Sequence, residues 1–192
     1  MFPLNFMSTI YFVFGLFQAI TGYAAWVFSK QESFQFNIND YSNIGSNPKR
    51  LVVYFSRMGY VKKQAYEAAN KTGAKIYEIK TSDKTKGTSG FWWCGLYGMF
   101  RWTMPIEPIE IDISSYEHVT ICTPIWVFSI ASPVREFCKQ VSKKIKKVDY
   151  ILLHHTNGKY KKAVGEMDKI LGITHIAVKS IQCKIGKYKV LE

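Results

Sequence analysis

Two stretches of the chain place polar or aromatic side chains directly after an apolar run. In the first, the apolar run 51–55 is followed by Ser56, Arg57 and Gly59. A hydroxyl, a guanidinium and a glycine just before a helix suit a phosphate group, because the free amides at a helix N-terminus attract anions and glycine permits the turn. In the second, an apolar run ends in a loop that carries Trp126, whose indole suits a flat aromatic ligand.

The elements that must position these residues follow from the pattern of apolar side chains. Both runs read as strands buried on two faces of a parallel sheet. Beyond residue 48, strand and helix patterns alternate. Strands are expected at 51–55, 74–79, 118–123, 150–154 and 175–181, and helices at 61–71, 132–146 and 159–171. This alternation predicts an α/β fold whose ligand site lies outside the carboxyl ends of the strands, where the two loops would form one pocket.

Three motifs in this order resemble the flavodoxin-like family, whose members bind FMN. Residues 54–60 resemble the family's phosphate loop, and 123–137 resemble its isoalloxazine loop followed by a proline-started helix. Residues 90–95, with Pro105 and Ile106 after them, resemble an insert of a quinone-reductase-like branch. The resemblance implies a doubly wound five-stranded parallel sheet in the order 2-1-3-4-5.

The same resemblance implies a non-covalently bound FMN held by three loops. The expected contacts are Ser56, Arg57, Met58, Gly59, Tyr60 and Val61; Thr123, Pro124, Ile125, Trp126, Val127 and Phe128; and Thr156, Asn157 and Gly158. Met58, Tyr60 and Val61 stand where the family commonly has hydroxyl or amide side chains, so backbone amides and Arg57 would carry the phosphate. The alternative is a cofactor-free flavodoxin-like module that binds a protein or lipid partner through its basic face.

No catalytic residue or metal site is predicted. His154 and His155 follow the strand at 150–154, and imidazoles titrate near neutral pH. A structural hydrogen-bonding role is the alternative for both. The four cysteines lack C-x-x-C or metal-like spacing and are expected to be reduced thiols: Cys94, Cys122, Cys138 and Cys183.

The N-terminal segment is apolar and uncharged. Residues 1–29 contain no charged side chain, and 10–28 form an apolar stretch of 19 residues. Such a stretch matches a bilayer core of about 30 Å, which predicts a transmembrane anchor over 1–30. A signal peptide should begin with basic residues, whereas the first Lys or Arg here is Lys30. A helix packed on the domain is the other alternative.

Charge predicts the topology and the partners. Since positive residues favour the cytoplasmic side, we expect a single-pass protein of the cell membrane with its domain inside. The domain, 49–192, carries 25 Lys and Arg against 12 Asp and Glu. A tethered basic domain is attracted to anionic lipid, and no nucleic-acid-binding motif accompanies the charge. Residues 31–48, rich in Asn, Ser and Gly, are expected to form a tether or an irregular wrap.

A Trp-rich segment at 90–104 holds three of the five tryptophans. It is interpreted as a wall over the flavin, a surface for a quinone-like substrate or a membrane-interfacial patch, with a helix packed on the sheet edge as the structural alternative. The predicted function is transfer of electrons or hydride, through FMN, between a reduced donor and an acceptor near the membrane, as in an FMN-dependent oxidoreductase.

Overall fold

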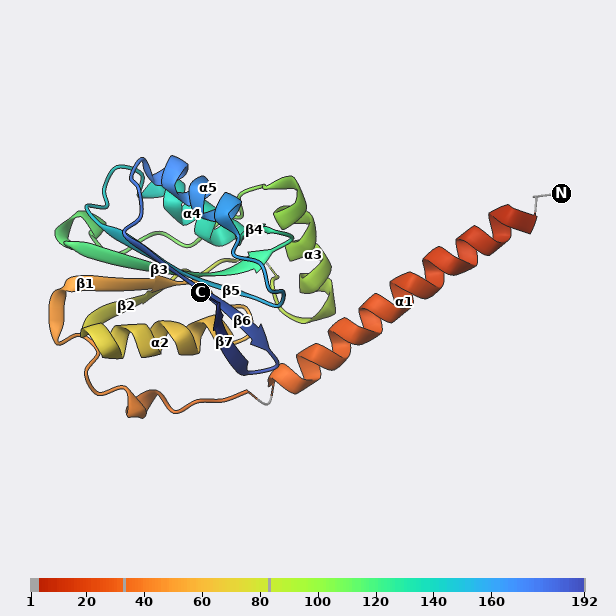
Figure 1. Ribbon diagram of the computed structural model, residues 1–192, viewed down its shortest axis with the longest axis horizontal. Helices are drawn as coiled ribbons and strands as arrows, with labels where there is room; N and C mark the ends of the chain where they lie inside the picture. The colour runs from red at the N-terminus through yellow and green to blue at the C-terminus, as the bar shows by residue number, and fades with distance from the viewer. Residues whose placement is uncertain (1–3, 33, 83, 192) are drawn as a thin grey trace.

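The computed structural model describes residues 4–32, 34–82 and 84–191, with side chains described from Met7 to Trp26 and from Phe34 onward within those ranges (Figure 1). It shows an α/β domain from which one long helix, α1 (Leu4–Glu32), projects. Residues 1–3 of the expected anchor, residue 33 of the expected tether and residue 192 of the expected domain lie outside the described residues.

The centre of the sheet consists of five parallel strands in the order β2-β1-β3-β5-β6. These strands are β1 (Asn47–Tyr54), β2 (Ala74–Glu78), β3 (His118–Trp126), β5 (Val148–His154) and β6 (Ala177–Lys184). Their order is the one that the resemblance implied. The expectation of a five-stranded sheet is nevertheless wrong, because the sheet has seven strands. β7 (Lys187–Leu191) pairs antiparallel with β6, and the short β4 (Ser129–Ile130) pairs antiparallel with β3.

Helices cover both faces of this sheet (Figure 1). Alternate residues of β1 face opposite ways: Leu51 and Val53 pack with α4 (Ser132–Gln140) and α5 (Lys161–Leu171), whereas Val52 and Tyr54 pack with α2 (Tyr60–Thr72). This alternation explains the continuous apolar run, since a central parallel strand is covered on both sides. α4 ends six residues before the expected 146, and Lys143 beyond it has a left-handed backbone with φ 62°.

The Trp-rich segment forms a further helix, α3 (Gly87–Phe100), which lies beside α1 at one end of the domain. Glycine lets α3 approach the sheet closely. A Cβ on Gly98 would lie 2.7 Å from the carbonyl oxygen of Trp126, which is closer than such atoms approach. α3 therefore packs directly against the end of β3.

The segment before β1 is an irregular wrap along α2. The ring of Phe34 lies 4.5 Å from that of Tyr60, and Asn43 donates from its backbone N–H to the side chain of Asn70 (2.9 Å). Asn43 also donates from its side chain to the backbone carbonyl of Asn70 (2.7 Å). β1 begins at Asn47, two residues before the expected start of the domain.

Within α1, Met7–Trp26 is long and apolar enough to cross a membrane, and 6% of this span is buried. A core helix of a soluble protein would be mostly covered, while a signal sequence meets the same test of length and composition. The contact with the domain includes Phe17, whose ring stacks on that of Trp92 in α3 at 5.2 Å. The N-terminal part of α1 extends away from the domain (Figure 1).

Candidate functional site

A cavity of about 360 Å³ lies at the carboxyl ends of the central strands. It falls within the usual range for small-molecule sites, roughly 300–1,000 Å³. Its lining comes from α1, the β1–α2 loop, α3, the ends of β3, β5 and β6, and the β6–β7 turn: Tyr23, Ala24, Ser56, Arg57, Met58, Tyr60, Val61, Phe91, Pro124, Ile125, Trp126, Leu153, His154, His155, Cys183 and Ile185. Most of these side chains are apolar or aromatic, with Ser56, Arg57 and the histidines as polar exceptions.

The register of the sheet brings the two expected loops together. Tyr54, the last residue of β1, lies opposite Cys122 of β3, and β3 continues to Trp126, so the end of β3 lies beside the loop that follows β1. The loop after β1 then turns into α2 at Gly59, whose φ of 86° is a left-handed conformation that glycine adopts without strain. The N–H of Gly59 donates to the hydroxyl oxygen of Ser56 at 3.0 Å. Ser56 therefore supports the turn at the start of α2, where the first amides have no intrahelical acceptor.

Arg57 supplies positive charge beside this turn. Its guanidinium lies 5.9 Å from the ring centre of Phe91 and 3.5 Å from the sulfur of Met58. Burial lowers the pKa of Arg57, and a hydrogen bond to Cys94 opposes that shift. Because the usual arginine pKa is above 12, the group stays charged at neutral pH. The cavity thus has a cation at the edge where α2 begins.

The end of β3 forms the aromatic side of the cavity. Trp126 lies edge-on to the buried Phe55 at 5.6 Å, and Pro124 and Ile125 line the cavity beside it. Thr123 is buried instead: its hydroxyl donates to the carbonyl of Pro124 (3.0 Å) and accepts from the N–H of Ala131 (3.4 Å).

The two-residue turn between β3 and β4 points away from the cavity. Val127 and Phe128 both have positive φ, 45° and 62°, and their side chains are exposed. Neither belongs to the cavity lining.

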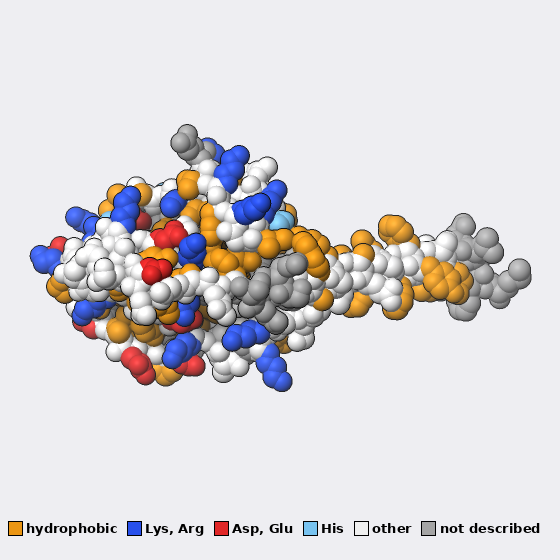
Figure 2. Space-filling view, turned by 90° about the horizontal axis from the view of Figure 1, so that it is seen from below, with side chains coloured by type: hydrophobic (Ala, Val, Ile, Leu, Met, Phe, Trp, Pro, Cys, Tyr) orange, Lys and Arg blue, Asp and Glu red, His pale blue; other side chains and the backbone are white. Residues whose placement is uncertain are grey.

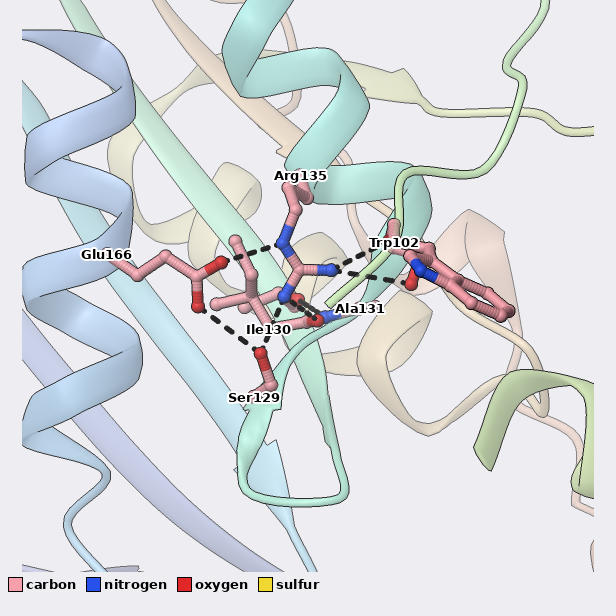
Figure 3. A network of polar contacts seen from close by, with 8 residues as sticks. Trp102, Ser129, Ile130, Ala131, Arg135 and Glu166 are labelled. Carbon is pink, nitrogen blue, oxygen red and sulfur yellow. Dashed lines mark hydrogen bonds and ion pairs between the residues drawn. The ribbon is translucent and has the colours of Figure 1, made fainter. Parts of the chain in front are cut away.

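A buried ion pair holds the β3–β4 hairpin in place (Figure 3). Arg135 of α4 is 2% exposed, and its Nε lies 2.7 Å from Oε1 of Glu166 in α5. The same guanidinium donates to the hydroxyl of Ser129 in β4 (2.5 Å) and to the carbonyl of Trp102 after α3 (2.9 Å). Ser129 also donates to Glu166 (3.2 Å). Arg135 is therefore a positioning residue for the hairpin that carries Trp126, and sequence reasoning missed it.

The residues expected from the third loop do not line the cavity, although the two histidines just before them do. His154 and His155 line the cavity, whereas 156–158 do not. The hydroxyl of Thr156 is hydrogen-bonded to the hydroxyl of Tyr160 and accepts from the N–H of Gly158 at 3.3 Å. Both hydrogen bonds join Thr156 to residues within the same turn.

Both ring nitrogens of His154 form hydrogen bonds within the protein. Its Nδ1 lies 2.8 Å from the carbonyl of Thr156, so it carries the proton, and its Nε2 accepts from the hydroxyl of Ser180 at 2.7 Å. Burial lowers the pKa of His154. A neutral imidazole with both nitrogens engaged matches the structural alternative better than acid–base catalysis.

Sequence reasoning also missed several cavity residues. Phe91 lies in the Trp-rich segment, for which a wall over the ligand was one interpretation. Ile185 belongs to the β6–β7 turn and Tyr23 to the N-terminal helix, and neither position carried a signal in the sequence.

The cysteines are free, and among residues 4–32, 34–82 and 84–191 no cluster of His, Cys, Asp or Glu could hold a metal ion. Burial raises the pKa of the Cys138 thiol to about 12 and raises that of Cys122 as well. Thiolate chemistry at these two positions is therefore disfavoured.

Comparison with protein-family models finds none that matches the chain, and no curated protein matches it. Solved structures do match. A flavoprotein from Lactobacillus acidophilus NCFM, crystallised in complex with FMN, is 22% identical with a TM-score of 0.59, over 70% of this chain and 93% of that one. A putative flavoprotein from Bacteroides uniformis ATCC 8492 is 19% identical with a TM-score of 0.62, over 71% and 91%. A third, from Bacteroides eggerthii DSM 20697, is 19% identical with a TM-score of 0.57, over 70% and 88%. The chain shares the α/β fold of these flavoproteins.

Proposed function

We propose that this chain is a membrane-anchored flavoprotein that binds FMN and passes electrons or hydride between a reduced donor and an acceptor near the membrane. The observation that carries the proposal is that the turn around Gly59, the Arg57 cation and the Trp126 indole meet at one cavity. The fold is that of structures described as flavoproteins, one of them crystallised with FMN. The cavity lies at the carboxyl ends of the strands, where ligands bind in doubly wound sheets.

The residues present fit the chemistry of FMN. Amides at the start of α2, together with the charge of Arg57, would hold the phosphate, and charge-assisted hydrogen bonds of this kind are strong. Trp126 and Phe91, two aromatic residues of the cavity lining, would contact the isoalloxazine ring. The bound flavin would supply the redox chemistry, and the protein would place it and exclude water.

No side chain of the cavity is assigned a proton-transfer step. His154 holds its two hydrogen bonds within the protein, and the remaining lining is mainly apolar. The contribution of the chain would therefore be binding, orientation and a cavity of low polarity. Such surroundings suit an acceptor that is itself aromatic and poorly soluble in water, such as a quinone-like molecule.

The membrane part of the proposal rests on α1 and on charge. Met7–Trp26 would cross the bilayer, and the positive residues beyond it would keep the domain on the cytoplasmic side. The basic surface would add attraction to anionic lipid. The expected partners are thus a membrane and a redox partner, with nucleic acid not expected.

The proposal is tested with full-length protein purified in detergent. We expect flavin absorbance and FMN in the supernatant after denaturation, and we expect apo-protein titrated with FMN to quench flavin fluorescence. Riboflavin, which lacks the phosphate, serves as the matched ligand: Arg57→Gln should weaken FMN binding but leave riboflavin binding unchanged. Colourless protein that takes up neither ligand would instead support the cofactor-free module.

A second readout uses Cys183, a half-buried residue in the cavity lining. Its alkylation rate should fall when FMN is present, because the ligand would cover it. An unchanged rate in the presence of bound FMN would place the flavin elsewhere.

A further inference from the structure

Helix α3 exposes large apolar side chains and carries no charged residue. The exposed residues on and just after it are Phe91, Trp93, Leu96, Met99, Phe100 and Trp102. In a soluble domain a helix normally turns a polar face to water. α3 therefore presents a surface suited to an apolar environment, and a contiguous apolar patch of this kind marks an interaction site.

Two hairpin tips add apolar side chains to this surface, although the backbone conformations of these turns favour other residue types. Val127 and Phe128 occupy the β3–β4 turn with positive φ, and Ile185 occupies the β6–β7 turn with φ 48°. Such turns favour Asn and Gly, and a β-branched residue at positive φ is an outlier. Phe128 is 72% exposed even though its ring stacks on that of Tyr160 at 6.5 Å, so the domain leaves most of this side chain uncovered. The two tips show large apolar side chains where small polar ones would fit better.

These elements meet around the mouth of the cavity. Phe91 of α3, Trp126 at the base of the first tip and Ile185 of the second all line it, together with Tyr23 of α1. Figure 2 shows apolar side chains gathered where α1 joins the domain, with Lys and Arg near their margin. In the sequence, cations also flank two of these elements, α3 and the Ile185 turn: Lys84, Lys86, Arg101, Lys184 and Lys187.

The position of α1 indicates what covers this surface. Phe17, which stacks on Trp92 of α3, lies nine residues inside the end of the apolar span at Trp26. At 1.5 Å per residue this is roughly 13 Å along the helix. If the span crosses a bilayer, α3 cannot lie wholly outside it, because it is in contact with a residue well within the span.

We propose that α3, the 127–128 tip and the Ile185 tip form a second membrane contact, here called the apolar collar, which inserts into the boundary between headgroups and acyl chains. The inference rests on the proposed membrane-spanning role of α1. Aromatic side chains favour that boundary, and the flanking cations suit anionic headgroups. The cavity mouth then faces lipid, and a molecule dissolved in the bilayer reaches the cavity without crossing water.

The test uses the full chain in vesicles of phosphatidylcholine and phosphatidylglycerol. On a Cys183→Ser background, whose other thiols are buried, Phe128→Cys is labelled with an environment-sensitive fluorophore. The matched control is Ile176→Cys, which replaces an apolar residue that is 61% exposed just before β6, at the opposite end of the sheet. Doxyl-labelled lipid should remove most of the emission from position 128 and leave that from position 176 unchanged.

Equal emission from both positions would overturn the collar. A label at 128 that is shielded from water but not quenched by doxyl lipid would also overturn it, and would indicate a protein partner or a second copy of the chain. Carbonate extraction separates this failure from failure of the anchor: protein that stays with the vesicles while position 128 is unquenched has an anchor but no collar. FMN uptake is measured on the same samples and has no bearing on the quenching result.

A second variant tests whether the apolar residues of the 127–128 tip stabilise the folded domain instead. Val127→Asn with Phe128→Gly gives the turn its preferred residues, so the urea midpoint of unfolding in detergent should not fall. A lowered midpoint would mean that the apolar tip stabilises the domain, and the collar would lose its strongest support.

Discussion

Breaking the ion pair between Arg135 and Glu166 should destabilise the domain far more than losing a surface pair. Glu166→Leu leaves a guanidinium that is 2% exposed without its carboxylate, and it removes the acceptor of the Ser129 hydroxyl. Removing one partner of a buried pair costs about 3–5 kcal/mol. For a chain of this length that corresponds to a fall in Tm of roughly 6–20 °C.

The double variant Arg135→Met/Glu166→Leu should recover much of this loss. Apolar side chains of similar volume leave no buried charge, and such replacements are often neutral or better. Recovery is incomplete because the carbonyl of Trp102 loses the hydrogen bond from the charged Arg135, and bonds to charged groups contribute about 1.5–3 kcal/mol. The two substitutions should therefore be strongly non-additive.

The assay is urea unfolding of full-length protein in detergent, followed by circular dichroism, for the wild type, both single variants and the double variant. Glu117→Leu is the control, since its pair with Lys49 is well exposed and contributes little. If the double variant loses as much stability as the two single variants combined, the pair is not a buried unit and the reasoning is refuted. If Glu117→Leu lowers the midpoint as much as Glu166→Leu does, burial is not the deciding factor.

Three further predictions concern the cavity and its frame. Gly59→Val should weaken FMN binding in titrations of apo-protein more than Ser56→Ala, because φ is 86° at that position; loss of binding in Ser56→Ala alone would contradict this. Gly98→Ala should lower both FMN affinity and the unfolding midpoint, since its Cβ would collide with Trp126; unchanged values would show that α3 shifts at no cost. His154 has a lowered pKa, so the unfolded state binds a proton first as the pH falls. Stability should therefore decrease below about pH 6.5, and this slope should be smaller in His154→Asn; equal slopes would assign the pH dependence to other groups.

The central sheet was predictable because its middle strands, β1, β3 and β5, are largely buried and give apolar runs in the sequence. β4 has two residues, too few for any pattern, and β7 is a short edge strand whose residues are exposed or half-buried, with two lysines among its five residues. Neither strand is buried enough to leave an apolar signature. A helix at α3 was expected only as the structural alternative for the Trp-rich segment, because its apolar residues surround the whole helix and Gly90, Gly95 and Gly98 weaken its helix propensity.

The site was predictable at the level of loops but not of single side chains. Strand order places the loop after β1 beside β3, and the register of Tyr54 with Cys122 lets the last residues of β3 extend past the end of β1. Which side chains enter the cavity depends on turn geometry. The two-residue turn sends Val127 and Phe128 outward, and local bonds keep Thr156 in its own turn. Whether Tyr23 lines the cavity depends on how α1 packs against the domain, and no local sequence pattern encodes that packing.

The contribution of α1 to the cavity wall has a thermodynamic consequence. A ligand that fills the cavity touches Tyr23 and Ala24, so its binding free energy includes a contribution from α1 in its docked position. Linkage is reciprocal: if docking of α1 strengthens binding by some factor, the ligand favours docking by the same factor. A spanning helix can adapt its tilt to bilayer thickness. If α1 spans a membrane and the cavity binds FMN, as proposed, cofactor occupancy and membrane thickness are coupled variables, and each can report on the other.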